Sequence, residues 1–274
     1  MSLMARPAPV TKATRPSGTP KVELAGVTLA YQSARHETLA VQDVSFRIEP
    51  GEFVSVVGPS GCGKSTCLSM LAGIEQPTTG VVALDGVPVT RPTGQVGIML
   101  QHDHLFEWRD VLGNVLVGAE VLGKDRDTAR ARAVELLERY GLGEFLHHRP
   151  SQLSGGMRQR VALVRTLVTD PDVVLLDEPF SALDFQTRLT LADEVVDILR
   201  RQNKTALLVT HDITEAISMS DRVIVMSGRP GSVRAEHRIS FAAGRLTPFE
   251  AREQPEFSRY FAAIWEELEV HVRR

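Results

Sequence analysis

Residues 58–66 read Gly-Pro-Ser-Gly-Cys-Gly-Lys-Ser-Thr and fit the pattern G-x-x-x-x-G-K-[ST]. The apolar run 53–57 before them predicts a buried strand, and residues 64–72 predict a helix that ends at Gly73. Between a strand and a helix, such glycines let backbone N–H groups surround phosphates, and the helix N-terminus adds partial positive charge. We therefore predict that a nucleotide is bound by the residues of this loop: Gly58, Pro59, Ser60, Gly61, Cys62, Gly63, Lys64, Ser65 and Thr66.

Two carboxylates, Asp177 and Glu178, follow a second apolar strand at residues 173–176. A buried parallel strand brings its last residues to the carboxyl edge of the sheet, where ligands of α/β proteins bind. Lys64 is expected to reach the β- and γ-phosphates, and Ser65 to ligate Mg²⁺. Asp177 is predicted to hold the same metal, and Glu178 to polarise an attacking water as general base. An isolated Asp-Glu pair would favour the alternative of a solvated strand end.

The composition sets limits on the class of protein. The chain has 274 residues, enough for one or two domains, and its net charge of −3 argues against broad non-specific binding to nucleic acid. The longest aliphatic run, 173–176, is far shorter than the ~20 residues of a membrane span. Two cysteines, Cys62 and Cys67, give neither a disulfide framework nor a metal spacing, which suits a reducing cytosolic compartment. Residues 1–20 hold four prolines and no acid and predict a disordered leader.

Strand and helix patterns alternate along the chain. Strands are predicted at 44–48, at 81–84 before an Asp-Gly turn, at 206–209 and at 223–226, the last of the series. Helices are predicted at 128–140 and around 189–200. Strand–helix–strand alternation implies an α/β fold with a mostly parallel sheet covered by helices.

Residues 153–160, Leu-Ser-Gly-Gly-Met-Arg-Gln-Arg, open a further predicted helix. Alone, Ser154 would be an ordinary N-cap. Together with the phosphate loop and the Asp-Glu pair, this string resembles the signature motif of ATP-binding cassette (ABC) proteins. The resemblance implies an α/β P-loop NTPase (RecA-like) core with an antiparallel β subdomain and an inserted α-helical subdomain. It also implies that Ser154, Gly155 and Gly156 face the γ-phosphate of ATP held by a second copy of the chain.

Four further residues match the family pattern in order. The resemblance implies that Tyr31, expected after the first strand, stacks on adenine, and that Gln101 senses Mg²⁺ and the attacking water. The segment Ser181-Ala-Leu-Asp184 resembles the loop that, in this family, links the two sites of the dimer, which implies a place for Asp184 at that loop. His211 resembles the histidine that contacts the γ-phosphate. As single residues, Tyr31 and His211 could equally be structural.

Three features narrow the resemblance within the family: Met157 after Ser-Gly-Gly, the segment 228–232, and the aromatic tail around 255–268. In these three features the chain resembles the ATPase subunits of nitrate, sulfonate, taurine and bicarbonate importers. Related systems that take up aromatic vitamin precursors share the same features. The resemblance implies an ATPase at the cytoplasmic face of the inner membrane, peripheral to a transmembrane permease and indirectly served by a solute-binding protein. Glu107, where many relatives carry Pro, departs from the pattern.

The predicted organisation is a leader at 1–20, an ATPase domain at 21–235 with a helical part at about 102–160, and a C-terminal helical extension at 236–274. Phe106 and Trp108 are candidate contacts to the permease, or they pack inside the helical part. The tail carries an apolar helical stripe that needs a cover, either its own domain, a second subunit or, least favoured because of its acids, a membrane. Three other functions stay open: the ATPase of an exporter or lipid-handling complex, a soluble ABC ATPase acting on DNA or ribosomes, and an ATP sensor without hydrolysis.

Overall fold

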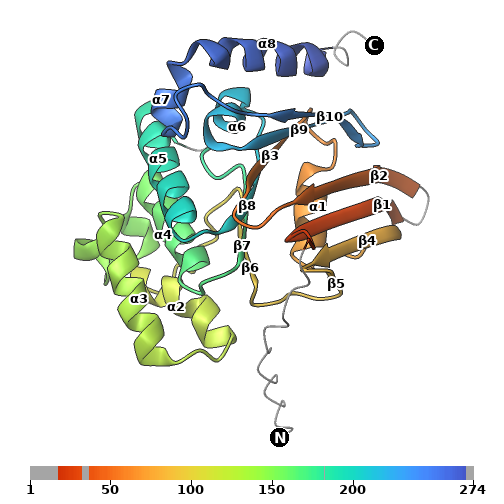
Figure 1. Ribbon diagram of the computed structural model, residues 1–274. Coiled ribbons are helices and arrows are strands. Elements are labelled where there is room, and N and C mark those ends of the chain that lie inside the picture. Colours follow the sequence, from red (N-terminus) through yellow and green to blue (C-terminus); the bar gives the residue numbers. More distant parts are fainter. Residues whose placement is uncertain (1–17, 33–36, 182, 270–274) are drawn as a thin grey trace, which may run out of the picture.

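The computed structural model describes residues 18–32, 37–181 and 183–269 (Figure 1). Most of the predicted leader, residues 1–17, lies outside these ranges, as does Ala182 of the predicted dimer loop. Within the described ranges, none of the helices has the length and apolar character needed to cross a membrane.

A six-stranded sheet runs through the centre of the molecule. Its strands, in spatial order, are β10 (Val233–Arg238), β9 (Arg222–Met226), β3 (Phe53–Val57), β8 (Thr205–Val209), β7 (Val173–Asp177) and β6 (Val96–Met99). All neighbours pair in parallel except β10, which runs antiparallel to β9. The α/β class predicted from the sequence is confirmed. The prediction that 223–226 is the last strand is wrong, because β10 follows it after a short loop.

A four-stranded antiparallel sheet lies beside the central one, on the right in Figure 1. Its order is β2 (Glu37–Ile48), β1 (Val22–Gln32), β4 (Thr79–Leu84) and β5 (Val87–Pro88). The predicted Asp-Gly turn joins β4 to β5, with positive φ at both Asp85 and Gly86, which fits a tight hairpin. Tyr31 pairs with Thr38 inside β1, so its expected place after the first strand is wrong.

Helices cover both faces of the central sheet. They are α1 (Lys64–Leu71), α2 (Val111–Val121), α3 (Arg126–Arg139), α4 (Gly155–Leu167), α5 (Phe185–Arg201), α6 (Ile213–Met219), α7 (Pro248–Arg252) and α8 (Pro255–Glu269), with short 3₁₀ turns at Gly143–Phe145 and Pro150–Gln152. The residues of β7 show the layering. Val173 and Leu175 face the core shared with α1 and the antiparallel sheet, whereas Val174 and Leu176 face the core shared with α4 and α5.

Helix α5 begins four residues before the start predicted from its apolar spacing. The side chain of Asp184 accepts a hydrogen bond from the backbone N–H of Thr187 at 3.0 Å, and this N-cap fixes the start at Phe185. The predicted domain limits cut through elements of the structure: residue 160 falls inside α4, and residue 235 inside β10.

The C-terminal tail packs on its own chain, which is the first of the three alternatives given for its apolar stripe. Helix α8 lies across α6, β9 and β10, at the top of Figure 1. Phe257 and Ile264 of α8 are buried there, and Tyr260 packs against them. Trp265 stacks on Phe261 at a centroid distance of 5.9 Å but stays half exposed, at 49%.

Candidate functional site

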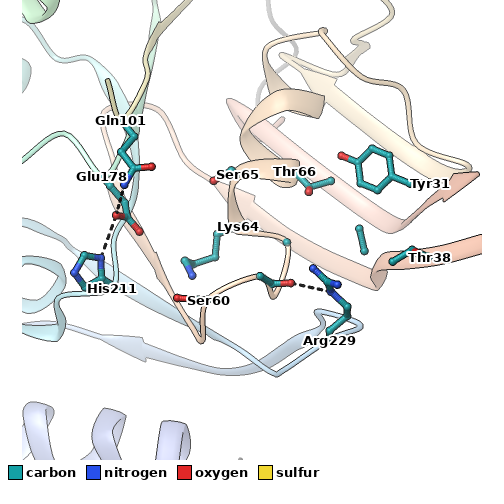
Figure 2. Close-up of a pocket in the computed structure, with 13 residues that line it drawn as sticks. Tyr31, Thr38, Ser60, Lys64, Ser65, Thr66, Gln101, Glu178, His211 and Arg229 are labelled. Atoms are coloured by element: carbon teal, nitrogen blue, oxygen red, sulfur yellow. Dashed lines mark hydrogen bonds and ion pairs between the residues drawn. The ribbon is translucent and has the colours of Figure 1, made fainter. Parts of the chain in front are cut away.

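A cavity of about 520 Å³ opens where the phosphate loop meets the two sheets (Figure 2). Its lining comes from segments far apart in the sequence: Tyr31, Thr38, Ala40, Ser60, Gly61, Gly63, Lys64, Ser65, Thr66, Gln101, Glu178, His211 and Arg229. Glu178, Gln101 and His211 lie together at one end in Figure 2, and Tyr31 and Thr38 lie at the other. A cavity of this size suits a small-molecule ligand.

The phosphate loop is held in shape by close packing and by its own lysine. Gly63 precedes α1 with φ of 97°, and a Cβ there would lie 2.3 Å from Cγ1 of Val41, so only glycine fits. The ammonium of Lys64 donates to the carbonyls of Gly58 at 2.8 Å and Pro59 at 3.0 Å. Lys64 is buried, and these bonds hold its charge inside the curve of the loop, where a phosphate would meet it.

Ser65 and Asp177 meet between the loop and the end of β7. The hydroxyl of Ser65 donates to Oδ1 of Asp177 at 3.1 Å. Burial raises the pKa of Asp177, while this hydrogen bond and Lys64 act in the opposite direction. A nearby cation would therefore favour the ionised carboxylate.

The two oxygens of Ser65 and Asp177 suit Mg²⁺, which usually takes one or two protein ligands and completes its shell with water and substrate phosphates. Within the described part of the chain there is no group of three or more His, Cys, Asp or Glu that could hold a metal. Binding of Mg²⁺ together with a phosphate ligand does not require a site in which all metal ligands come from the protein. Any cation here would be bound jointly with the phosphates.

Glu178 is contacted by two polar side chains from neighbouring segments. Nε2 of Gln101 donates to Oε2 of Glu178 at 3.1 Å, and Nδ1 of His211 lies 3.1 Å from the same oxygen. The backbone of Glu178 has φ of 46°, an uncommon conformation for a residue with a side chain. Such local strain is typical of functional positions, and here it turns the carboxylate toward the cavity.

The other end of the cavity holds Tyr31, which the sequence analysis assigned to the site, and three residues that it did not assign. Tyr31 lines the cavity and is 44% exposed as a residue, and its hydroxyl donates to Glu75 at 2.6 Å. Thr38, Ala40 and Arg229 also line it. Arg229 belongs to the segment 228–232, which the sequence analysis used only to narrow the family resemblance. Only the fold shows that this segment reaches the phosphate loop.

Of the predicted site residues, Gly58, Pro59, Cys62 and Asp177 do not line the cavity themselves but belong to the phosphate loop or hydrogen-bond to it. Four others lie away from the cavity of their own chain: Ser154, Gly155, Gly156 and Asp184. Ser154 caps α4, with its hydroxyl accepting from the N–H of Met157 at 3.3 Å. A Cβ at Gly156 would lie 3.2 Å from Cγ2 of Thr187 in the first turn of α5, so the start of α4 adjoins the loop at Asp184. Ser154, Gly155 and Asp184 are exposed, and the four residues form one surface separate from the cavity.

Comparison with known proteins identifies the family to which a chain with this site belongs. The family model for "ABC transporter" matches residues 41–181, just over half of the chain. The chain belongs to the ABC transporter family. As the ATP-binding subunit of that family, this ABC ATPase binds and hydrolyses ATP.

Relatives cover most of this ABC ATPase. It is 45% identical over 242 residues to an uncharacterised ABC transporter ATP-binding protein, YtlC, of Bacillus subtilis strain 168, which covers 88% of this chain and 93% of that protein. It is 44% identical over 202 residues to the taurine import ATP-binding protein TauB of Yersinia pestis bv. Antiqua strain Antiqua, covering 74% of this chain and 79% of TauB. The dimeric bacterial ABC cassette MJ0796 aligns with a TM-score of 0.72 and 32% identity, covering 80% of this chain and 98% of that one.

Proposed function

We propose that this ABC ATPase energises an importer of small anionic or organic solutes of the nitrate, sulfonate, taurine and bicarbonate type. The arrangement of Gln101 and His211 around Glu178, at the end of a cavity bordered by Lys64, carries the hydrolytic part of this proposal. The importer assignment is supported by relatives such as the taurine import protein TauB of Burkholderia thailandensis, 39% identical over 245 residues.

The residues of this chain have distinct tasks in the proposed reaction. The phosphate loop, residues 58–66, and Lys64 hold the phosphate chain, and Tyr31 stacks on the adenine. Ser65 and Asp177 would hold Mg²⁺ with Gln101 nearby, and the ion, when bound, neutralises charge on the phosphate oxygens.

Glu178 accepts the proton of the attacking water. Its Oε2 already faces Gln101 and His211, which leaves Oε1 for the water. His211, on the loop after β8, is placed to contact the γ-phosphate or the phosphate that leaves. The two contacts fix the carboxylate, so the water is held in one orientation for in-line attack.

A second copy of the chain completes each site in this proposal. Ser154, Gly155, Gly156 and Asp184 form a surface outside their own cavity, and the helix N-terminus at Gly155 is a suitable anion contact. Solved relatives include a dimeric cassette and a post-hydrolysis cassette with ADP and phosphate. ATP would therefore hold two chains together, and loss of phosphate would loosen them. A membrane permease bound near Gln101, assisted by a solute-binding protein, would convert this cycle into transport.

The transporter assignment is tested by affinity capture. A tagged Glu178→Gln chain is incubated with MgATP and detergent-solubilised membranes of the source cell, and bound proteins are identified by mass spectrometry; Lys64→Ala is the matched control. We expect a multi-span permease with the first variant and its loss with the second. Ribosomal or DNA-repair proteins without a permease would instead support a soluble ABC ATPase.

The solute class requires a second step. The captured permease and its solute-binding protein are reconstituted in proteoliposomes with the wild-type chain, and ATP hydrolysis is measured with taurine, nitrate, bicarbonate or no solute. Stimulation by one of these anions supports the importer assignment. Stimulation only by a lipid or by no imported solute would favour the exporter or lipid-handling alternative.

A further inference from the structure

The loop between β9 and β10 is fixed against both the antiparallel sheet and the phosphate loop. The N–H of Gly231 donates to the carbonyl of Ala40 at 3.0 Å, and the N–H of Gln42 donates to the carbonyl of Gly231 at 2.8 Å. The base of the loop is closed by the N–H of Ser232, which donates to the hydroxyl of Ser227 at 2.9 Å. Residues 228–231 are thus held in one place beside the cavity.

Glycine is required at position 231 by the closeness of the phosphate loop. A Cβ on Gly231 would lie 1.8 Å from the carbonyl oxygen of Cys62 and 2.9 Å from the side chain of Met226. Real Cβ atoms do not approach backbone this closely, so the two loops meet backbone to backbone. This contact brings the neighbouring Arg229 to the rim of the nucleotide cavity.

Arg229 presents a cation to the cavity. Its Nε donates to the carbonyl of Gly61 at 3.2 Å, the dashed bond beside the phosphate loop in Figure 2. A guanidinium has five N–H donors, so the two terminal amino groups keep four of them for other partners. Across the described ranges, no aspartate or glutamate forms an ion pair with Arg229.

We propose that Arg229 is a nucleotide-binding residue whose guanidinium contacts the phosphate chain of ATP or ADP. This inference rests on the proposed nucleotide site at residues 58–66. The Nε bond to Gly61 orients the guanidinium plane against the loop whose backbone N–H groups surround the phosphates. A guanidinium that is fixed at one nitrogen and unpaired at the others is suited to bind phosphate oxygens in a forked geometry.

The contact has a chemical consequence for affinity. Because Arg229 lines the cavity at the end away from Glu178 in Figure 2, we expect its contact with the phosphates to be the same before and during hydrolysis. An interaction that is equal in the ground and transition states changes KM and leaves kcat nearly constant. Arg229 is therefore a positioning and affinity residue, distinct from the residues that handle the water.

The test measures equilibrium binding of MgATP and MgADP to the full chain at several salt concentrations. For Arg229→Ala we expect Kd to rise about tenfold, in line with loss of one charge-assisted hydrogen bond. The salt dependence of Kd should also become shallower, because one cation no longer meets the phosphates. Arg229→Lys should recover part of the affinity and the wild-type salt dependence. Arg234→Ala, an exposed arginine on β10, is the matched control and should bind as the wild type does.

The outcomes separate this inference from the proposed site. Failure of the wild type to bind MgATP, or unchanged binding by Lys64→Ala, would overturn both. If Lys64→Ala loses affinity but Arg229→Ala keeps it, only the role of Arg229 is wrong. If Arg229→Ala loses affinity with an unchanged salt dependence, and Arg229→Lys is equally poor, Arg229 acts by shaping the loop through Gly61, and the phosphate contact is refuted.

Discussion

Nδ1 of His211 lies 3.1 Å from Oε2 of Glu178, across the gap between two parallel strands of the central sheet. Glu178 directly follows β7, and His211 comes shortly after the end of β8. Because β7 and β8 are adjacent strands, the sheet itself sets the separation of the two residues. Gln101 reaches the same oxygen from the end of β6. Three neighbouring strand ends therefore orient one carboxylate, which is the geometric basis of the proposed water activation.

The Glu178→Gln variant should bind MgATP but hydrolyse it at no more than about 1% of the wild-type rate, because the amide cannot accept the proton of water. Binding is measured by calorimetry and hydrolysis by phosphate release. Glu135→Gln, at an exposed position of α3, is the control and should be fully active. Turnover near the wild-type rate in the Glu178 variant would remove Glu178 from the role of general base.

Stability should depend on pH through Glu215, a buried residue of α6. Burial raises the pKa of Glu215, whereas the hydrogen bond from Thr210, at 2.8 Å, and the charge of Arg188 act in the opposite direction. Because the folded chain favours the protonated form, the ionised carboxyl costs stability at neutral pH. Glu215→Gln should therefore raise Tm at pH 7 to 8, and the gain should shrink as the pH falls through the raised pKa toward the ordinary value of 4.5. A gain that grows on acidification would contradict the assignment.

Gly231→Ala should destabilise the chain, because its Cβ would meet the carbonyl of Cys62. Overpacking at a rigid contact costs about 1–3 kcal/mol in the free energy of unfolding, measured by urea titration. ATP affinity should fall as well, since the phosphate loop must shift. Gly155→Ala is the stability control, where the nearest atom within 4 Å is Nη2 of Arg158 at 4.0 Å, and it should change stability by no more than about 0.5 kcal/mol. Equal stability of the two variants would show that the 228–231 loop yields easily.

Adjacent residues of α8 provide a matched test of how the tail is held. Ile264 is fully buried against α6 and β9, and truncation to alanine should cost about 2–4 kcal/mol in the free energy of unfolding. Trp265 is 49% exposed, so Trp265→Ala should cost less than about 1.5 kcal/mol despite the larger side chain. The two values come from urea unfolding curves under one condition. A larger loss at Trp265 would mean that its outer face is covered in solution.

The sequence predicts helices and strands most reliably where the pattern that indicates them is local. The apolar runs at 53–57 and 173–176 became β3 and β7 because buried parallel strands need apolar residues on both faces. The start of α5 was misplaced because apolar spacing locates the buried face, while the hydrogen-bonded cap at Asp184 decides where the helix begins. Strand β10 was missed because its exposed face carries Arg234, Glu236 and Arg238, which read as a polar loop.

The same difference between local patterns and tertiary contacts separates the predicted from the unpredicted residues of the site. Lys64, Ser65, Asp177 and Glu178 come from two local patterns at strand ends, and the structure brings them to one cavity or its edge. Arg229 has no such pattern, because its position depends on the pairing of β9 with β10 and on the backbone contact at Gly231. Only tertiary contacts could have placed it beside Gly61.

The cavity draws its walls from residues as far apart as Tyr31 and Arg229, so it exists only when nearly the whole described chain has folded. A nucleotide held there binds the folded chain and not the unfolded one, and at 100 times its Kd it adds about 2.7 kcal/mol to the free energy of unfolding. Resistance to proteases that cleave unfolded segments would then follow the cellular supply of nucleotide. A starved cell would degrade this subunit faster than a well-fed one.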